Sequence, residues 1–253
     1  MHTIIKNFNP ETTATKLIHW LNINCKSYPA QGFVIGLSGG IDSAVVAALL
    51  MRTHYPATGL ILPSATTSQV DIQDAYRVAE YCQLPVIEIP ITPVFDQFIT
   101  ATTPLNNPKA VRQNVVSGNV QARLRMMMLY TYAQNHDYIV VGTDNACEWL
   151  MGYFTKFGDG AADIAPLIHL QKQQVYDLAE HLGIPSSIIH KKPSAGLWVG
   201  QTDEDEMGVT YPEIDAYLRG ESVSATALER IHFWHERSHH KRRLPLFPEW
   251  DDL

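Results

Sequence analysis

Four short apolar runs alternate with longer helical patterns in the first part of the chain. The runs are FVIGL (33–37), TGLILP (58–63), LPVIEIP (84–90) and DYIVVGT (137–143). Apolar runs of this length are typical of strands that are buried on both faces, and strands that alternate with helices form parallel sheets. The pattern therefore predicts an α/β fold, with a parallel twisted sheet flanked by helices on both faces.

After Asn145 the strand patterns stop, and the remaining sequence predicts a helical C-terminal part. Helical patterns cover residues 171–183, 210–220 and 224–243. Since a domain usually holds about 100–200 residues, we expect the 253 residues to form one domain, 1–253, with no room for a glutamine-hydrolysing domain.

The segment GNVQARLRMMMLYTYAQ (118–134) is apolar on nearly all sides of a helix. Such a helix is buried on most sides. Two explanations stay open for this segment: it packs between the sheet and another helix, or it forms a subunit interface.

The composition and net charge of the chain exclude some classes of protein. Hydrophobic residues make up 45% and charged residues 18%, which are globular values, and no run is long and apolar enough to cross a membrane. The net charge of −7 disfavours a nucleic-acid partner. The N-terminus lacks the apolar core of a signal peptide, and Cys25, Cys82 and Cys147 show no paired spacing, so we expect free thiols in the cytoplasm.

The stretch SGGIDS (38–43) joins the first apolar run to an apolar helix. Glycines at the start of a helix let an anion approach the free N–H groups of the first turn, so the stretch predicts a phosphate site. The lysine of a Walker A loop is absent, and Asp42 beside a phosphate favours a bound magnesium ion. The plainer interpretation is a tight turn in which Asp42 and Ser43 cap the helix.

A second group of polar residues follows the last apolar run. Between Val141 and Lys172, a span with many apolar residues also holds a dense group of polar ones, among them Thr143, Asp144, Glu148, Lys156, Asp159, Asp163 and Lys172. Any one of them could belong to a turn or a solvated face. Together, after a strand predicted to lie near the glycine loop, they indicate residues that line a site.

These motifs resemble those of a known family. SGGIDS is similar to the PP-loop of the N-type ATP pyrophosphatases, which cleave ATP to AMP and pyrophosphate. The succession GNVQARLRM, GTDNACE, GYFTKFGDGAAD and HHKRRLP resembles the motifs of ammonia-dependent NAD synthetases, in order from Gly36 to about Pro245. The loop alone is shared by several enzyme classes, whereas TKFGDGAAD points to NAD synthetase.

The resemblance implies a role for each matching residue. Asp159 and Lys172 would be catalytic, and Asp42 and Glu148 would bind Mg2+. ATP would be bound by Gly36, Leu37, Ser38, Gly39, Gly40, Ile41, Asp42, Ser43, Thr143, Lys172 and Ser194. Deamido-NAD would be bound by Arg123, Lys156, Asp163, His240 and Lys241. In three places the chain departs from the family: Ser194 replaces a common threonine, Asn145 a histidine and Cys147 an alanine. We expect Asn145 and Cys147 to contact no proposed ligand-binding residue.

The function implied by the resemblance is the amidation of deamido-NAD by ammonia, with ATP as co-substrate and an acyl-adenylate as intermediate. The family also implies a homodimer. Two alternatives stay open: another PP-loop ATP pyrophosphatase, such as an amidotransferase or a tRNA thiolase, and a non-enzymatic module that binds adenine nucleotides. The acidic balance and the absence of a catalytic cysteine pair speak against a thiolase.

Overall fold

The structure, a computed structural model, describes residues 4–105, 107, 113–193 and 202–248. Within these ranges one parallel sheet is built from β1 (Gly32–Gly36), β2 (Ala57–Ile61), β3 (Val86–Glu88) and β4 (Tyr138–Val141), in the order β3-β2-β1-β4. Phe33 pairs with Ala57 on one side and with Ile139 on the other. The chain runs from β1 outward to β2 and β3 and then returns to the other side of β1 to form β4. The strand order therefore reverses between β1 and β4, and ligands of open α/β sheets bind at such a switch point.

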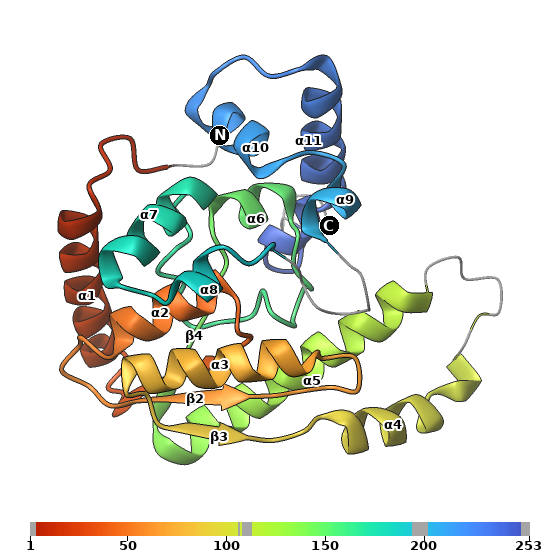
Figure 1. The fold of residues 1–253 in the computed structure, drawn as a ribbon. Coiled ribbons are helices and arrows are strands. Elements are labelled where there is room, and N and C mark those ends of the chain that lie inside the picture. The colour runs from red at the N-terminus through yellow and green to blue at the C-terminus, as the bar shows by residue number, and fades with distance from the viewer. Residues whose placement is uncertain (1–3, 106, 108–112, 194–201, 249–253) are drawn as a thin grey trace.

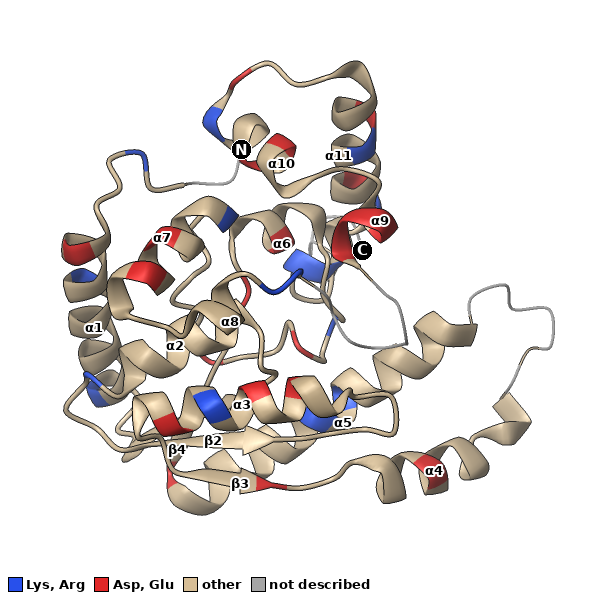
Figure 2. Cartoon of the chain, viewed as in Figure 1, with Lys and Arg blue, Asp and Glu red and all other residues tan. Residues whose placement is uncertain are grey.

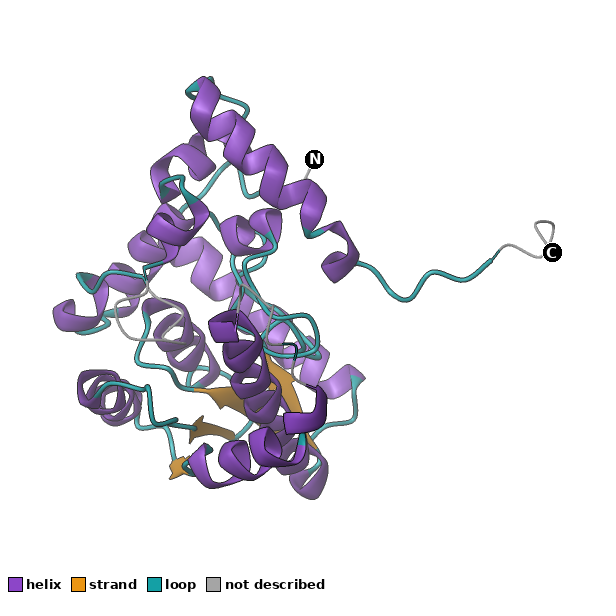
Figure 3. Cartoon of the chain, turned by 90° about the vertical axis from the view of Figure 1, so that its right-hand side faces the viewer, coloured by secondary structure: helices purple, strands orange, loops and turns teal. Residues whose placement is uncertain are grey.

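Helices cover both faces of the sheet (Figures 1 and 3). Phe33 and Ile35 of β1 belong to the larger core, which also contains residues of α1 (Pro10–Ser27), α2 (Ile41–Leu50), α3 (Gln69–Cys82), α7 (Lys172–Leu182) and α8 (Ser186–Ile189). The intervening Val34 points to the other face, where α5 (Gln113–His136) packs and α4 (Thr92–Ala101) and η1 (Thr103–Leu105) follow β3. The predicted fold class is confirmed.

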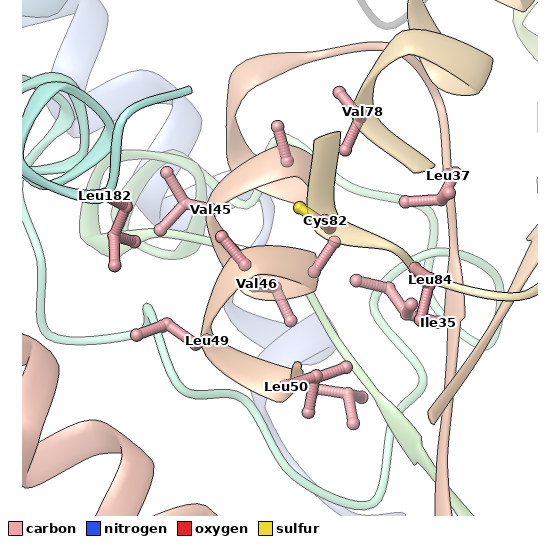
Figure 4. Packing of buried hydrophobic residues seen from close by; sticks show 14 of the residues in the cluster. Ile35, Leu37, Val45, Val46, Leu49, Leu50, Val78, Cys82, Leu84 and Leu182 are labelled. Atoms are coloured by element: carbon pink, nitrogen blue, oxygen red, sulfur yellow. The ribbon is translucent and has the colours of Figure 1, made fainter. Parts of the chain in front are cut away.

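Helix α2 shows why the glycine loop is held firmly. Every residue of α2 except Asp42 is buried. Its side chains interdigitate with those of β1, α3 and α7 (Figure 4), the labelled residues being Ile35, Leu37, Val45, Val46, Leu49, Leu50, Val78, Cys82, Leu84 and Leu182. Because burying each leucine or valine stabilises the fold by about 1.5–3 kcal/mol, the start of α2 is a rigid platform.

Within the methionine-rich segment 118–134, the prediction of burial on most sides is confirmed: only Arg123, Met127, Thr131 and Gln134 are exposed, and the other positions are buried or half-buried. Gln121, Ala122 and Leu124 of α5 are buried, but Val116 and Met127 are 58% and 57% exposed. The sheet covers one side of α5 and α4 contacts another part of it. An apolar surface is therefore left open on α5.

The predicted helical C-terminal part is confirmed. The helices α6 (Ala146–Met151), α9 (Asp203–Met207), α10 (Tyr211–Arg219) and α11 (Ala225–Arg237) build a second hydrophobic cluster, and η2 (His239–Arg242) follows it. Figure 1 shows α10 and α11 beyond the edge of the layered part, and Figure 2 shows α9 as an acidic helix. No described helix combines the length and apolar character that a membrane span needs.

Candidate active site

The turn between β1 and α2 has the geometry of an anion-binding site. Gly39 has φ of +75°, and a Cβ there would overlap the backbone oxygen of Asp71 on α3. Gly40 is the N-cap of α2, and among the described residues no side chain caps this helix. Ser43 instead donates its hydroxyl to the oxygen of Gly40 (3.0 Å) and contacts the hydroxyl of Ser38 (3.1 Å). The plainer interpretation of Asp42 and Ser43 as caps is therefore wrong, and the first turn of α2 keeps N–H groups for an anion.

Lys172 joins two carboxylates that are far apart in the sequence. Its Nζ lies 2.6 Å from Oδ2 of Asp42 and 3.5 Å from Oε1 of Glu148. Asp42 opens α2, Glu148 lies in α6 and Lys172 opens α7, so three elements meet at one point. The Lys172 side chain is 2% exposed. Burial would lower its pKa, but the charges of Asp42 and Glu148 outweigh this effect and raise it, so Lys172 stays charged.

The second carboxylate of this trio is a weak acid in the free protein. Burial and the charge of Asp42 raise the pKa of Glu148 to about 8, against the opposing effect of Lys172. Its Oε2 accepts the backbone N–H of Asn145 at 3.0 Å, which fixes the side chain. Two carboxylates close together beside a phosphate loop suit magnesium, which is held by one or two carboxylates and phosphate oxygens. The donor set of Asp42 and Glu148 therefore fits Mg2+.

Asn145 contradicts the expectation that it touches no proposed ligand-binding residue. Its Nδ2 donates to Oδ1 of Asp42 at 2.9 Å, and its Oδ1 accepts the N–H groups of Cys147 and Glu148. Asn145 is fully buried between β4 and α6. It thus orients Asp42 and starts the helix that carries Glu148, a role that a sequence pattern alone does not reveal.

Cys147 makes a buried contact that its place in the motif did not suggest. Its Sγ donates to Oδ1 of Asp215 at 2.9 Å, and Asp215 also accepts the backbone N–H groups of Lys172 (3.1 Å) and Gln173 (3.0 Å). Burial and the charge of Asp215 raise the pKa of Cys147 well above its usual range, so the thiol keeps its proton and donates. Asp215 is not one of the proposed ligand-binding residues, so this contact does not contradict the expectation for Cys147, although the thiol reaches the carboxylate that holds the start of α7.

A cavity of about 340 Å³ opens at the carboxyl ends of the strands. Its lining includes most of the residues that the sequence assigns to ATP, magnesium and catalysis: Gly36, Leu37, Ser38, Gly40, Ile41, Asp42, Ser43, Thr143, Glu148, Asp159 and Lys172. Gly39 lies behind them and contacts α3. Apolar side chains, among them Ile61, Leu62 and Met126, line another part of the cavity. The cavity thus has a polar phosphate end and an apolar wall of the kind that a base or ribose needs.

Asp159 and Asp144 form the acidic wall of the cavity. Asp159 accepts the backbone N–H of Thr155 at 2.9 Å, and desolvation raises its pKa. Burial, followed by the charges of Asp159, Glu148 and Asp42, raises the pKa of Asp144 well above its ordinary value. Asp144 belongs to the group that the sequence predicts to line a site, but it was assigned no ligand, although its place three residues after the last strand could have suggested one.

The residues that the sequence assigns to the dinucleotide gather beside the cavity rather than in its lining. Arg123 donates to the backbone oxygen of Lys156 at 3.3 Å, so these two residues lie side by side. Lys241 donates to the oxygens of Gly152 (2.8 Å) and Phe154 (2.6 Å) on the loop that leads to Lys156. His240, next to Lys241, is exposed.

Asp163 is placed differently from the other residues assigned to the dinucleotide. Its Oδ2 accepts the backbone N–H of Val140 at 2.7 Å, which ties it to β4. This bond gives Asp163 a structural contact that its motif did not suggest. Ser194 lies outside the described residues.

Lys191 was also missed by the sequence analysis. Its Nζ contacts Asp71 (2.5 Å) and Asp74 (3.0 Å) on α3 and the backbone oxygen of Gly39 (3.2 Å). These contacts brace the phosphate turn from behind. A lysine next to a motif in a polar loop carries no pattern that predicts partners more than one hundred residues away.

A parallel sheet with a glycine turn before an uncapped helix, and a lysine held by two carboxylates at the switch point, defines an α/β nucleotide-binding protein of the PP-loop class. The family model for NAD synthase matches residues 13–245. The chain belongs to the NAD synthase family.

Individual relatives agree with this family over nearly the whole chain. It is 55% identical to an NH(3)-dependent NAD(+) synthetase of Mannheimia succiniciproducens, over 94% of this chain and 96% of the relative. The solved structure of NMN synthetase from Francisella tularensis is similar with a TM-score of 0.93 and 56% identity, over 96% of this chain and all of that one. An NH3-dependent NAD synthetase from Campylobacter jejuni, solved with a nitrate ion, has a TM-score of 0.77 and 28% identity over 96% of this chain and all of that one.

Proposed function

We propose that this protein amidates deamido-NAD with ammonia to give NAD, and that ATP is cleaved to AMP and pyrophosphate. The observation that carries the proposal is the contact of Lys172 with both Asp42 and Glu148 at the mouth of the glycine turn. A site of this kind neutralises the charge of a departing pyrophosphate. The names of relatives that match most of the chain support the same reaction.

The chemistry explains why these groups are needed. A carboxylate repels nucleophiles and has no good leaving group, so it is first joined to the α-phosphorus of ATP as an acyl-adenylate. The Pα–O bond to pyrophosphate breaks in that step, and ammonia then displaces AMP. The N–H groups of α2 and the charge of Lys172 stabilise the leaving pyrophosphate, where removal of one such donor typically costs about 2.7–4 kcal/mol. When bound by Asp42 and Glu148, Mg2+ would supply further positive charge to the phosphates.

Asp159 is the candidate that handles the nitrogen donor. Ammonium predominates in solution, but only ammonia attacks, so a carboxylate that binds the cation and takes its proton assists the second step. Its place on the acidic wall and its raised pKa suit both tasks. We expect Asp159→Asn to raise the KM for ammonium far more than the KM for ATP. Unchanged ammonium kinetics in steady-state assays would remove this role.

One assay separates the proposed function from its two alternatives. Pyrophosphate release from ATP is measured with ammonium, with and without deamido-NAD. The proposed function requires release that depends on deamido-NAD. Release without it would indicate another PP-loop ATP pyrophosphatase, and binding of ATP without release would indicate a non-enzymatic nucleotide module.

A second candidate substrate is the mononucleotide, nicotinic acid mononucleotide. The observation that favours it is the TM-score of 0.93 to a protein described as NMN synthetase, at 56% identity. Both substrates present the same carboxylate to ATP, so the residues that activate it do not distinguish them. Comparison of kcat/KM for the mononucleotide and the dinucleotide under equal ATP and ammonium decides between the two products.

We further propose that residues 1–253 act as one domain that takes free ammonia in the cytoplasm and works as a homodimer. Support for the dimer comes from apolar side chains that α4 and α5 leave exposed: Val94 (45%), Phe98 (44%), Val116 (58%) and Met127 (57%). The two helices contact each other and project together in Figure 1. Sedimentation of the wild type and of Phe98→Glu tests this arrangement. A dimer that the glutamate dissociates supports it, and a monomeric wild type excludes it.

A further inference from the structure

Arg125 is a cation that lines the cavity, and none of the roles assigned above involves it. It lies on α5, lines the cavity and donates through Nε to the backbone oxygen of Leu62 at 2.9 Å. Its Nη2 reaches Oγ1 of Thr67 at 3.5 Å. These contacts tie the guanidinium to the carboxyl end of β2 and to the turn that follows it. They occupy only part of the five N–H donors of an arginine.

No carboxylate in the described part of the chain forms an ion pair with Arg125. Burial lowers its pKa to about 10, while the charge of Asp159 opposes this effect, so the group remains charged at neutral pH. A partly desolvated cation with free donors is costly unless an anion satisfies it. The cavity thus contains a fixed positive charge that has no protein counter-ion among the described residues.

Two lysines near the phosphate turn differ from Arg125 in this respect. Lys172 is paired with Asp42 and Glu148, and Lys191 with Asp71 and Asp74. Arg125 stands by the apolar wall, next to Leu62 and Met126, and feels the charge of Asp159 on the acidic wall. This is the part of the cavity that lies between the nucleotide's apolar pocket and the proposed ammonia site.

We propose that Arg125 binds the anionic oxygens at the point where the carboxylate of the nicotinic acid nucleotide attacks the α-phosphate of ATP. The inference rests on the proposed function, because it names a group that serves the same reaction. As the carboxylate oxygen bonds to Pα and the bond to pyrophosphate breaks, charge on the non-bridging oxygens is stabilised by the guanidinium. No proton moves to or from Arg125 in this step.

The variants are Arg125→Met, which keeps length without charge, and Arg125→Lys, which keeps charge without the planar fork. Arg52→Met is the matched control, because Arg52 also donates to backbone oxygens, of Ala48 (2.6 Å) and Leu182 (3.3 Å), but does not line the cavity. Affinities are measured by calorimetry for AMP against adenosine, and for the nicotinic acid nucleotide against its amide. Pyrophosphate release is measured in parallel.

We expect Arg125→Met to weaken the anionic ligand by about 10-fold to 100-fold, as for loss of a hydrogen bond to a charged group, and to leave the neutral ligand unchanged. Loss confined to AMP identifies the α-phosphate, and loss confined to the nicotinic acid nucleotide identifies the carboxylate. Arg125→Lys should recover part of the affinity, and Arg52→Met should bind both anions as the wild type does.

Two results overturn the inference. One is equal affinity of wild type and Arg125→Met for both anions, and the other is an equal loss for charged and neutral ligands, which indicates a structural role. If the methionine variant does not fold, Arg125→Lys decides, since unchanged anion affinity in that variant also overturns the inference. A wild type that releases no pyrophosphate refutes the proposed function, whereas the binding comparison still reports on Arg125.

Discussion

The carboxylate of Asp215 holds the start of the helix that Lys172 opens: its Oδ1 lies 3.1 Å from the backbone nitrogen of Lys172. Asp215 is buried in α10, in the C-terminal helical part, whereas Lys172 is the first residue of α7, which belongs to the larger core beside the sheet. The side chain that neutralises the two carboxylates of the active site is therefore positioned by a distant part of the chain.

Replacement of Asp215 by asparagine should lower kcat by at least about 10-fold. An amide offers one acceptor oxygen where two N–H groups and a thiol now donate, and a buried group left unpaired costs about 1–3 kcal/mol. Steady-state kinetics and urea unfolding measure the two effects. Glu213→Gln on the same helix is the control, because Glu213 is half-buried and, in the part of the chain that the structure describes, bonds only to Thr210 at the helix start and to Ser224. Equal kcat in both variants would show that Asp215 does not position Lys172.

Gly39→Ala should cost more stability than Gly220→Ala, although both glycines have positive φ, +75° and +80°. The left-handed backbone alone costs an alanine about 1–2 kcal/mol. At Gly39 the added carbon also meets the backbone oxygen of Asp71, whereas nothing lies within 4 Å of it at Gly220. Thermal unfolding should show a larger fall in Tm for Gly39→Ala than for Gly220→Ala, and ATP titration should show weaker nucleotide binding for Gly39→Ala alone. Matching losses in both variants would contradict the contact with α3.

The pKa of Glu148 predicts how stability depends on pH in the absence of nucleotide. The pKa is about 8 in the folded protein and about 4.5 in the unfolded chain, so the folded state binds the extra proton between these values. The free energy of unfolding should therefore fall as pH rises from 5.5 to 7.5, with a contribution from this group of about 2.5 kcal/mol.

Glu148→Gln removes this contribution and provides the comparison. The stability of the variant relative to the wild type should increase between pH 5.5 and pH 7.5, as measured by urea unfolding. A wild type that gains stability over the variant across this range would reverse the sign and reject the raised pKa.

The three cysteines should resist thiol reagents in the native protein at pH 8. Cys25, Cys82 and Cys147 are free and buried. Burial raises the pKa of Cys25 and of Cys82 to about 11, so both stay protonated, and only a thiolate reacts. Colour development with an aromatic disulfide should be absent in buffer and should correspond to three thiols in urea. A thiol that reacts within minutes in buffer would show that one of these sites opens.

Much of the layered fold could be predicted because its signals are local. Apolar runs, glycines and helical periods lie within a few residues of each other, and they placed the sheet, the glycine turn and the helical C-terminal part. The contacts of Asn145 and Cys147 escaped prediction because their partners, Asp42 and Asp215, are distant in sequence. A pattern reports the residue type that a position needs, but the pairing of a buried donor depends on how separate elements pack.

For α5, the sequence left two explanations open, packing within the chain and a subunit interface. Its methionines and tyrosines give the same periodicity whether the second covering layer comes from the same chain or from another one. Arg125 was missed because an arginine inside an apolar helix reads as a surface residue until the cavity beside it is seen.

The capping of α7 by α10 has a consequence for how the protein comes into being on the ribosome. The lysine that serves ATP has no fixed place until the last fifth of the polypeptide has been made and has folded back against it. A half-finished chain carries the glycine turn, yet it lacks the brace that the late helix provides.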